Sequence, residues 1–179
     1  MNNTRGFLVC FLHGKESGPQ GKKIEVLSRI ARDFNCRIFA PDFRGMFDAE
    51  QRVTKFLAEL PAQQQSGGGL VLVGSSMGGY VALRASQSLP VAGLFLLAPS
   101  VSMPGYATAE PPACAGTTSI VHGWQDKVVE PEKVIRFAAG NRLELHMVDA
   151  GHDLSDALSR VEFLFRDFLS RVLPPGVEN

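Results

Sequence analysis

Residues 70–85 read LVLVGSSMGGYVALRA, and this stretch decides the fold because it joins a strand to a helix through a tight turn. The run 70–73 is apolar throughout, as in a buried central strand, and residues 80–85 are compatible with a helix. Between them, Gly74, Ser76 and Gly78 form a Gly-x-Ser-x-Gly pattern. In this setting a strained turn lifts the serine hydroxyl above the sheet edge, and the glycines avoid a steric collision. The stretch predicts Ser76 as a nucleophile; the alternative is a glycine-rich connection without a chemical role.

The same alternation of strand and helix extends over almost the whole chain. Short apolar runs that suit buried strands lie at 7–12, 37–40, 70–73, 94–97, 119–121 and 143–148. Apolar residues recur at three- and four-residue steps, as in amphipathic helices, over 24–34, 53–60 and 154–172. This order predicts an open α/β sheet of about six mostly parallel strands with helices on both faces.

Length and local composition favour a single domain. The chain has 179 residues, enough for one hydrophobic core, and we expect one domain over 1–179. Its ordered core is expected at about 5–173, followed by a C-terminal tail at 174–179. The segment QQQSGGG at 63–69 is predicted to be a flexible loop inside this domain.

Charge and hydropathy exclude several classes of partner. Eighteen basic residues balance eighteen acidic ones without a dense basic cluster, so neither nucleic acid nor an anionic membrane surface is expected. No apolar run reaches the ~20 residues of a membrane span. The polar start at 1–6 is unlike a signal peptide, so a cytoplasmic protein is predicted. The oligomeric state is left open.

The cysteines and histidines predict no metal site. The chain has an odd number of cysteines, Cys10, Cys36 and Cys114, and no two of them have Cys-x-x-Cys spacing. This pattern is typical of reduced thiols that are structural or incidental. None of the four histidines, at 13, 122, 146 and 152, belongs to a His/Cys ligand cluster.

A serine nucleophile needs a base that takes its proton and an acid that orients the base. His152 follows the last strand-like run, and Asp126 lies in the loop after the preceding run. Both should therefore lie at the carboxyl ends of parallel strands, at the same sheet edge as Ser76. Asp149 and Asp153 flank His152 and compete for the acid role. We prefer Asp126, whose loop can point toward the outer imidazole nitrogen, and expect Asp153 to cap the last helix.

Acyl transfer also needs donors aimed at the developing oxyanion, usually backbone amides. The backbone N–H groups of Met77, which follows the nucleophile, and of Lys15, after the first strand, are the candidates. The Lys15 side chain is expected to be solvated. His13 is expected to be structural, with its ring bonded to neighbouring loops.

Together these segments resemble the α/β-hydrolase superfamily. The shared pieces are His13-Gly14, 41–45 (PDFRG), 74–78 (GSSMG), 122–126 (HGWQD) with Val128, Val129 and Pro131, and Gly151-His152. The opening 13–19 (HGKESGP) is also similar to small bacterial hydrolases described as esterases or thioesterases. The resemblance implies a minimal α/β-hydrolase fold with Ser76 as nucleophile, His152 as base and Asp126 as acid, and no cofactor.

The chain departs from larger family members in two places. Its first strand-like run corresponds to what the family would call its third strand, so we expect no antiparallel leading strands. Larger members insert a lid domain at the position of residues 100–118. Here this segment is short and rich in Pro, Gly and Ala. We therefore expect no lid, a shallow and open cleft, and no lipase-like interfacial activation. Arg44 is expected to pair with Asp42. Trp124, beside the acid loop, is a candidate substrate-binding residue; the alternative is that it packs under that loop.

Three functions remain open at this point. The first is a serine hydrolase that cleaves small or medium acyl esters through an acyl-enzyme. The second is a thioesterase or an acyl-protein hydrolase, which would use the same residues. The expected partner is a small-molecule acyl ester or thioester substrate. A binding protein that kept the fold and lost the chemistry is the third, although every catalytic position is filled here.

Overall fold

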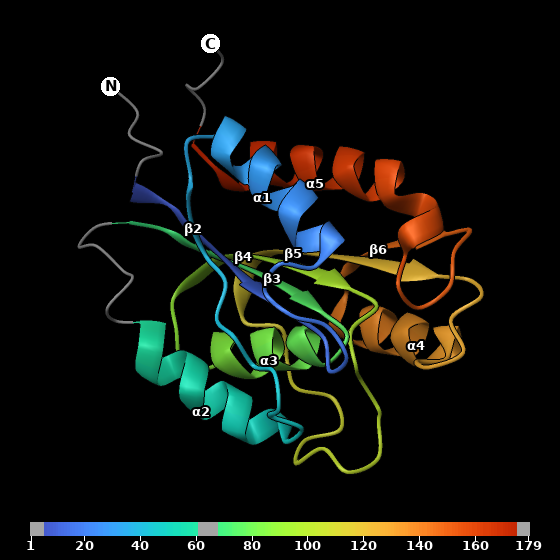
Figure 1. Cartoon of the computed structure of the whole chain (residues 1–179). Helices are drawn as coiled ribbons and strands as arrows, with labels where there is room; N and C mark the ends of the chain where they lie inside the picture. The colour runs from blue at the N-terminus through green and yellow to red at the C-terminus, as the bar shows by residue number, and fades with distance from the viewer. Residues whose placement is uncertain (1–5, 61–67, 175–179) are drawn as a thin grey trace.

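A computed structural model describes residues 6–60 and 68–174. Its six strands form one sheet in the order β2-β1-β3-β4-β5-β6, and all neighbouring pairs are parallel (Figure 1). The strands are β1 (Leu8–Leu12), β2 (Arg37–Phe39), β3 (Leu70–Ser75), β4 (Val91–Leu97), β5 (Ala115–Gly123) and β6 (Glu144–Val148). The predicted parallel sheet is confirmed. The predicted loop at 63–69 falls mostly, and the predicted tail at 174–179 almost wholly, outside the described residues.

Helices cover both faces of the sheet, as predicted (Figure 1). On one face lie α1 (Lys22–Asp33) and α5 (Leu158–Val172), and on the other α2 (Ala49–Glu59), α3 (Met77–Ser86) and α4 (Pro131–Asn141). Residues 98–114, between β4 and β5, contain neither helix nor strand, so the described chain has no lid domain at this position.

The alternation of side chains along β1 builds two hydrophobic cores. Leu8, Cys10 and Leu12 pack into the core beneath α2, α3 and α4, whereas Val9 and Phe11 pack into the core beneath α1 and α5. Both faces of this strand are therefore buried, which explains why its sequence is continuously apolar. Burial raises the pKa of Cys36 to about 11 and that of the Cys10 thiol further, so neither is a thiolate at neutral pH.

The last helix begins later than predicted. Leu154 has a left-handed backbone with φ 58°, and a 3-10 turn at Ser155–Ala157 precedes α5. Leu154 is nonetheless fully buried, so it continues the apolar stripe without being helical. Asp153 does not cap α5 as expected. Its Oδ1 instead accepts from Ser155 N at 3.0 Å and from Ser155 Oγ at 2.8 Å, at the start of the 3-10 turn. In the described part of the chain, no helix combines the length and apolar character needed to span a membrane.

Candidate active site

Ser76 lies at the sharp turn between β3 and α3. Its backbone, with φ 53° and ψ −119°, is in a region that non-glycine residues rarely adopt, and the surrounding chain holds it there. Ser76 N donates to Leu97 O at 2.9 Å, and Ser100 N donates to Ser76 O at 3.1 Å. The hydroxyls of Ser76 and Ser100 lie 3.5 Å apart. The turn is therefore fixed by bonds to the end of β4 and the segment after it.

The glycines around Ser76 are required by close backbone packing. A Cβ at Gly78 would lie 1.8 Å from Leu12 O, and one at Gly74 would lie 2.4 Å from Gly78 O. Both contacts are with backbone atoms, which cannot rotate away as a side chain would. The Gly-x-Ser-x-Gly pattern thus lets the first turn of α3 pack directly against the end of β1.

A chain of two hydrogen bonds joins Ser76 to His152 and Asp126. His152 Nε2 lies 2.9 Å from Ser76 Oγ, and His152 Nδ1 lies 2.7 Å from Asp126 Oδ2. An ionised carboxylate can only accept, so Nδ1 carries a proton toward Asp126. In the neutral imidazole, Nε2 is then the acceptor for the serine hydroxyl. These residues come from loops after β3, β5 and β6, which the parallel sheet brings to one edge.

Asp126 is held in an ionised state by its neighbours. Its Oδ1 accepts from the backbone amides of Val128 at 2.8 Å and Val129 at 2.9 Å. Burial alone would raise the pKa of Asp126, but hydrogen bonds from His152 and these amides outweigh it, and the pKa lies below its ordinary value. Behind it, the ring of buried His122 donates from Nε2 to Val129 O at 3.0 Å.

The two competing carboxylates have other partners. Asp149 Oδ1 accepts from the side-chain amide of Gln125, and Asp153 is bonded to Ser155. Of the three candidates, Asp126 is the one that forms a hydrogen bond with the His152 ring among residues 6–60 and 68–174. The geometry therefore favours Asp126.

The two candidate oxyanion donors come from the start of α3 and from the loop after β1. Met77 is the first residue of α3, where a backbone N–H has no partner within the helix, and Lys15 follows β1. Both residues line the same cavity as Ser76. Nearby, His13 has the structural role expected: its Nδ1 donates to Gly14 O at 2.8 Å, and its Nε2 accepts from Phe43 N at 2.8 Å.

The cavity that Ser76 lines is large. It has a volume of about 1460 Å³, compared with the roughly 300–1,000 Å³ of ordinary ligand sites. One wall comes from α1, and another comes from residues 103–107 in the segment between β4 and β5. The short segment thus lacks a lid domain but forms part of the cavity wall.

Contacts to α3 anchor that wall. Tyr80 OH donates to Glu50 Oε1 at 2.6 Å and accepts from Thr108 N at 3.2 Å. The rings of Tyr80 and Tyr106 lie 4.5 Å apart, and Arg84 Nε donates to the same Glu50 oxygen at 3.1 Å. The wall is therefore tied to the fold through buried Tyr80.

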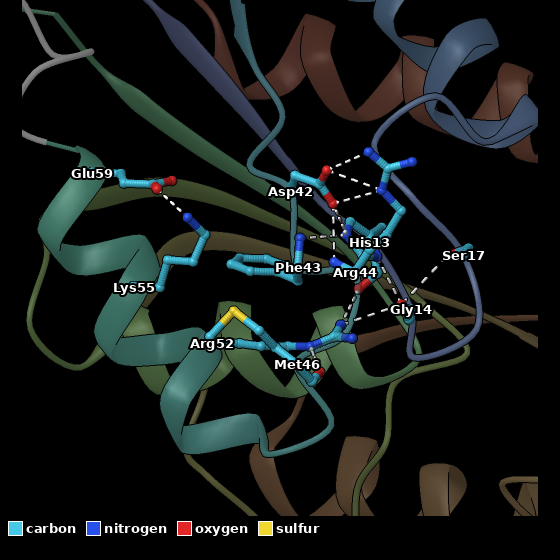
Figure 2. A network of polar contacts seen from close by, with 10 residues as sticks. All are labelled: His13, Gly14, Ser17, Asp42, Phe43, Arg44, Met46, Arg52, Lys55 and Glu59. Carbon is cyan, nitrogen blue, oxygen red and sulfur yellow. Dashed lines mark hydrogen bonds and ion pairs between the residues drawn. The ribbon is translucent and has the colours of Figure 1, made fainter.

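Two further side chains named from the sequence have different outcomes. Arg44 pairs with Asp42 as expected, with Nη2 and Oδ2 2.6 Å apart, and its hydrogen bonds lower the pKa of Asp42 to about 2 (Figure 2). Trp124 is 55% exposed and does not line the cavity, so the structure does not place it in a substrate-binding position. Val128, from the same loop, lines the cavity instead.

Two buried histidines predict that acid weakens the fold. Burial lowers the pKa of His13 and of His122 below the ordinary imidazole value. Each stays neutral in the folded protein but gains a proton in the unfolded chain below about pH 6.5, so acid favours unfolding. We expect the free energy of unfolding to fall between pH 7 and 5, by at most about 1.4 kcal/mol per pH unit for each histidine. Denaturant titrations across this range measure it, and His13→Gln should flatten the dependence; an unchanged slope contradicts the assignment.

Comparisons with a family model and with solved structures point to the same protein family. A model of the alpha/beta hydrolase family matches residues 11–175. A candidate hydrolase of the α/β superfamily from Xanthomonas campestris pv. campestris has a TM-score of 0.82 and 29% identity, over 93% of this chain and 99% of that one. An α/β serine hydrolase without a lid, from Xanthomonas campestris, has a TM-score of 0.76 and 21% identity, over 95% and 84%. Among curated proteins, no match is found.

Proposed function

The chain belongs to the alpha/beta hydrolase family, and we propose that it is a serine hydrolase that cleaves small or medium acyl esters. The observation that carries this proposal is the pair of hydrogen bonds from Ser76 through His152 to Asp126, at 2.9 and 2.7 Å. A serine activated in this way is the nucleophile of acyl transfer on several unrelated folds.

Acylation would begin at Ser76. Its Oγ attacks the ester carbonyl while His152 Nε2 takes the hydroxyl proton, and Asp126 stabilises the imidazolium that forms. The backbone amides of Met77 and Lys15 donate to the oxyanion of the tetrahedral intermediate. When that intermediate collapses, His152 gives its proton to the leaving alcohol, and the acyl group remains on Ser76.

Water then releases the acid. His152, neutral again, takes a proton from a water molecule that attacks the acyl-enzyme carbonyl. As the second tetrahedral intermediate collapses to the free acid, His152 returns that proton to Ser76 Oγ, which restores the serine hydroxyl. Each proton transfer and each oxyanion contact in these steps uses a protein group. The proposed chemistry therefore calls for no metal or organic cofactor.

The cavity supports an acyl group of medium size. Its volume of about 1460 Å³ exceeds what a short acyl chain fills, and apolar side chains from α1 and the 103–107 wall, including Ile24, Leu27 and Met103, line it.

A thioesterase or an acyl-protein hydrolase would use the same nucleophile. Rates of hydrolysis of acyl esters, acyl thioesters and S-acylated peptides with the same acyl chain distinguish these enzymes from an esterase.

Labelling with a fluorophosphonate probe tests the proposal. We expect wild type to carry one adduct, identified on Ser76 by mass spectrometry, because the probe requires an activated serine. Ser76→Ala should lose the adduct and ester hydrolysis while keeping the wild-type circular dichroism spectrum. Ser170→Ala, at an exposed position on α5, is the matched control and should retain both. Folded wild type without an adduct would favour the binding-protein alternative.

A further inference from the structure

Arg52 is a fully buried arginine at the centre of the network in Figure 2. It lies on α2, and its guanidinium donates to three backbone carbonyls in two loops. Nε donates to Met46 O at 2.7 Å, and Nη1 donates to His13 O at 3.0 Å and Gly14 O at 3.2 Å. The side chain therefore joins the loop after β1 to the loop after β2.

This arginine is buried without an acidic partner. Among residues 6–60 and 68–174, no carboxylate forms an ion pair with it, and the ring of Phe43 lies 5.3 Å from the guanidinium carbon. Its Nη2 is buried without a hydrogen-bond partner in the same part of the chain. Burying an unpaired cation is unfavourable, and an apolar side chain would fill this space at lower cost. Core packing alone is therefore a poor explanation for an arginine at this position.

The carbonyl of Gly14 connects Arg52 to the proposed oxyanion site. Gly14 C=O and Lys15 N–H belong to one planar trans peptide, so they point in opposite directions. Gly14 O is held by Arg52 Nη1 and by His13 Nδ1, at 3.2 and 2.8 Å. Bonds that hold the oxygen also set the direction of the Lys15 N–H on the far side of the same plane.

This peptide also lies against the nucleophile turn. A Cβ built on Gly14 would be 3.5 Å from both Ser76 Cβ and Ser75 O, and Lys15 and Ser76 line the same cavity. A rotation of this peptide would therefore change the position of its N–H relative to Ser76. A cationic donor on the carbonyl should also polarise the amide and strengthen its N–H as a donor.

We propose that Arg52 is a positioning residue that holds the Gly14–Lys15 peptide so that the Lys15 N–H faces the oxyanion. This role rests on the proposed serine-hydrolase function. It acts through the loop, since Arg52 itself does not line the cavity.

A medium-chain alkyl trifluoromethyl ketone is the probe that separates this role from a structural one. Its carbonyl carbon bonds to Ser76 Oγ, the serine proton moves to His152, and the carbonyl oxygen becomes a hemiketal oxyanion whose ionisation is followed by 19F NMR. Weaker donation to that oxygen raises the pH at which it ionises. The first variant, Arg52→Met, removes all three hydrogen bonds to the loop carbonyls. The second, Arg52→Lys, keeps the positive charge but lacks the planar guanidinium group.

We expect both variants to lower kcat for an acyl ester by about ten- to hundredfold with little change in KM, because the contact forms in the transition state. The hemiketal should ionise at higher pH in both, and Arg52→Lys should lie between Arg52→Met and wild type. The matched control is Phe56→Leu, a buried change on the same helix at a residue whose ring stacks on that of Phe39 and which forms none of the hydrogen bonds of Arg52. It should lower the melting temperature but leave kcat and hemiketal ionisation near wild type.

The outcomes distinguish the two proposals. If wild type forms the hemiketal on Ser76 but the ionisation and kcat of folded Arg52→Lys equal those of wild type, Arg52 has no positioning role. The same conclusion follows if Phe56→Leu shifts ionisation as much as the Arg52 variants, because loss of stability would then explain the effect. If wild type forms no Ser76 adduct, the proposed function itself fails. Should Arg52→Met not fold, Arg52→Lys, with a similar volume and charge, decides the question.

Discussion

Asp126→Asn is expected to lower kcat/KM for an acyl ester by about ten-thousandfold. Oδ1 of Asp126 accepts from the amides of Val128 and Val129, so an asparagine would keep its oxygen there. Its NH2 group would then face His152 Nδ1, which would have to accept. The proton would move to Nε2, and that nitrogen could no longer take the proton of Ser76. Steady-state kinetics with a chromogenic ester measure the loss.

Two isosteric controls lie in the same region. Asp149→Asn and Asp153→Asn remove the competing carboxylates, whose partners are Gln125 and Ser155, and each should stay within about threefold of wild type. A loss of activity in Asp149→Asn comparable to that in Asp126→Asn would overturn the assignment of the acid. The melting temperature of each variant shows whether a loss reflects unfolding.

Gly78→Ala is expected to destabilise the protein by about 3 kcal/mol or more. The added Cβ would lie 1.8 Å from the Leu12 carbonyl oxygen and 2.9 Å from that of His13. Relief requires α3 to move away from the end of β1, and that movement would disturb the Ser76 turn. Denaturant unfolding gives the stability change, and fluorophosphonate labelling of the remaining folded protein reports on the turn.

Gly140→Ala is the matched control for this substitution. Gly140 lies in α4, and no other segment within residues 6–60 and 68–174 comes within 4 Å of a Cβ built there. Since alanine is the better helix former, this change should stabilise the protein by about 0.5–1 kcal/mol. If the two alanine variants had similar stability, the backbone packing described for Gly78 would be wrong.

Most of the fold follows from local patterns. Each of the six predicted runs overlaps a strand. The signal is clearest for β1, β3 and β4, because strands buried on both faces leave a continuous apolar run of a length that helices rarely have. The apolar periodicity places the start of α5 too early, because Leu154 keeps the spacing of the helix while its backbone is left-handed. Periodicity reports which side chains are buried, and a buried residue outside the helix gives the same signal.

The site was predictable to a different degree for each residue. Ser76 stands in a motif with its own steric requirement, and His152 is the only histidine in the loop after the last strand. Asp126 could be preferred over Asp149 and Asp153 only by an argument about loop direction. Arg52 and the wall at 103–107 carried no signal, because an arginine on a helix is usually solvated and a loop rich in Pro and Gly shows no periodicity.

The sequence by itself determined a parallel α/β sheet and the candidate residues at its carboxyl edge, because burial pattern and motif spacing are local properties. Only the tertiary structure decided which carboxylate meets His152, that residues 103–107 line the cavity, and that Arg52 holds the loop beside Ser76. Each of these depends on contacts between segments far apart in the chain. Such contacts exist only once the sheet has formed and the loops at its edge have packed on one another.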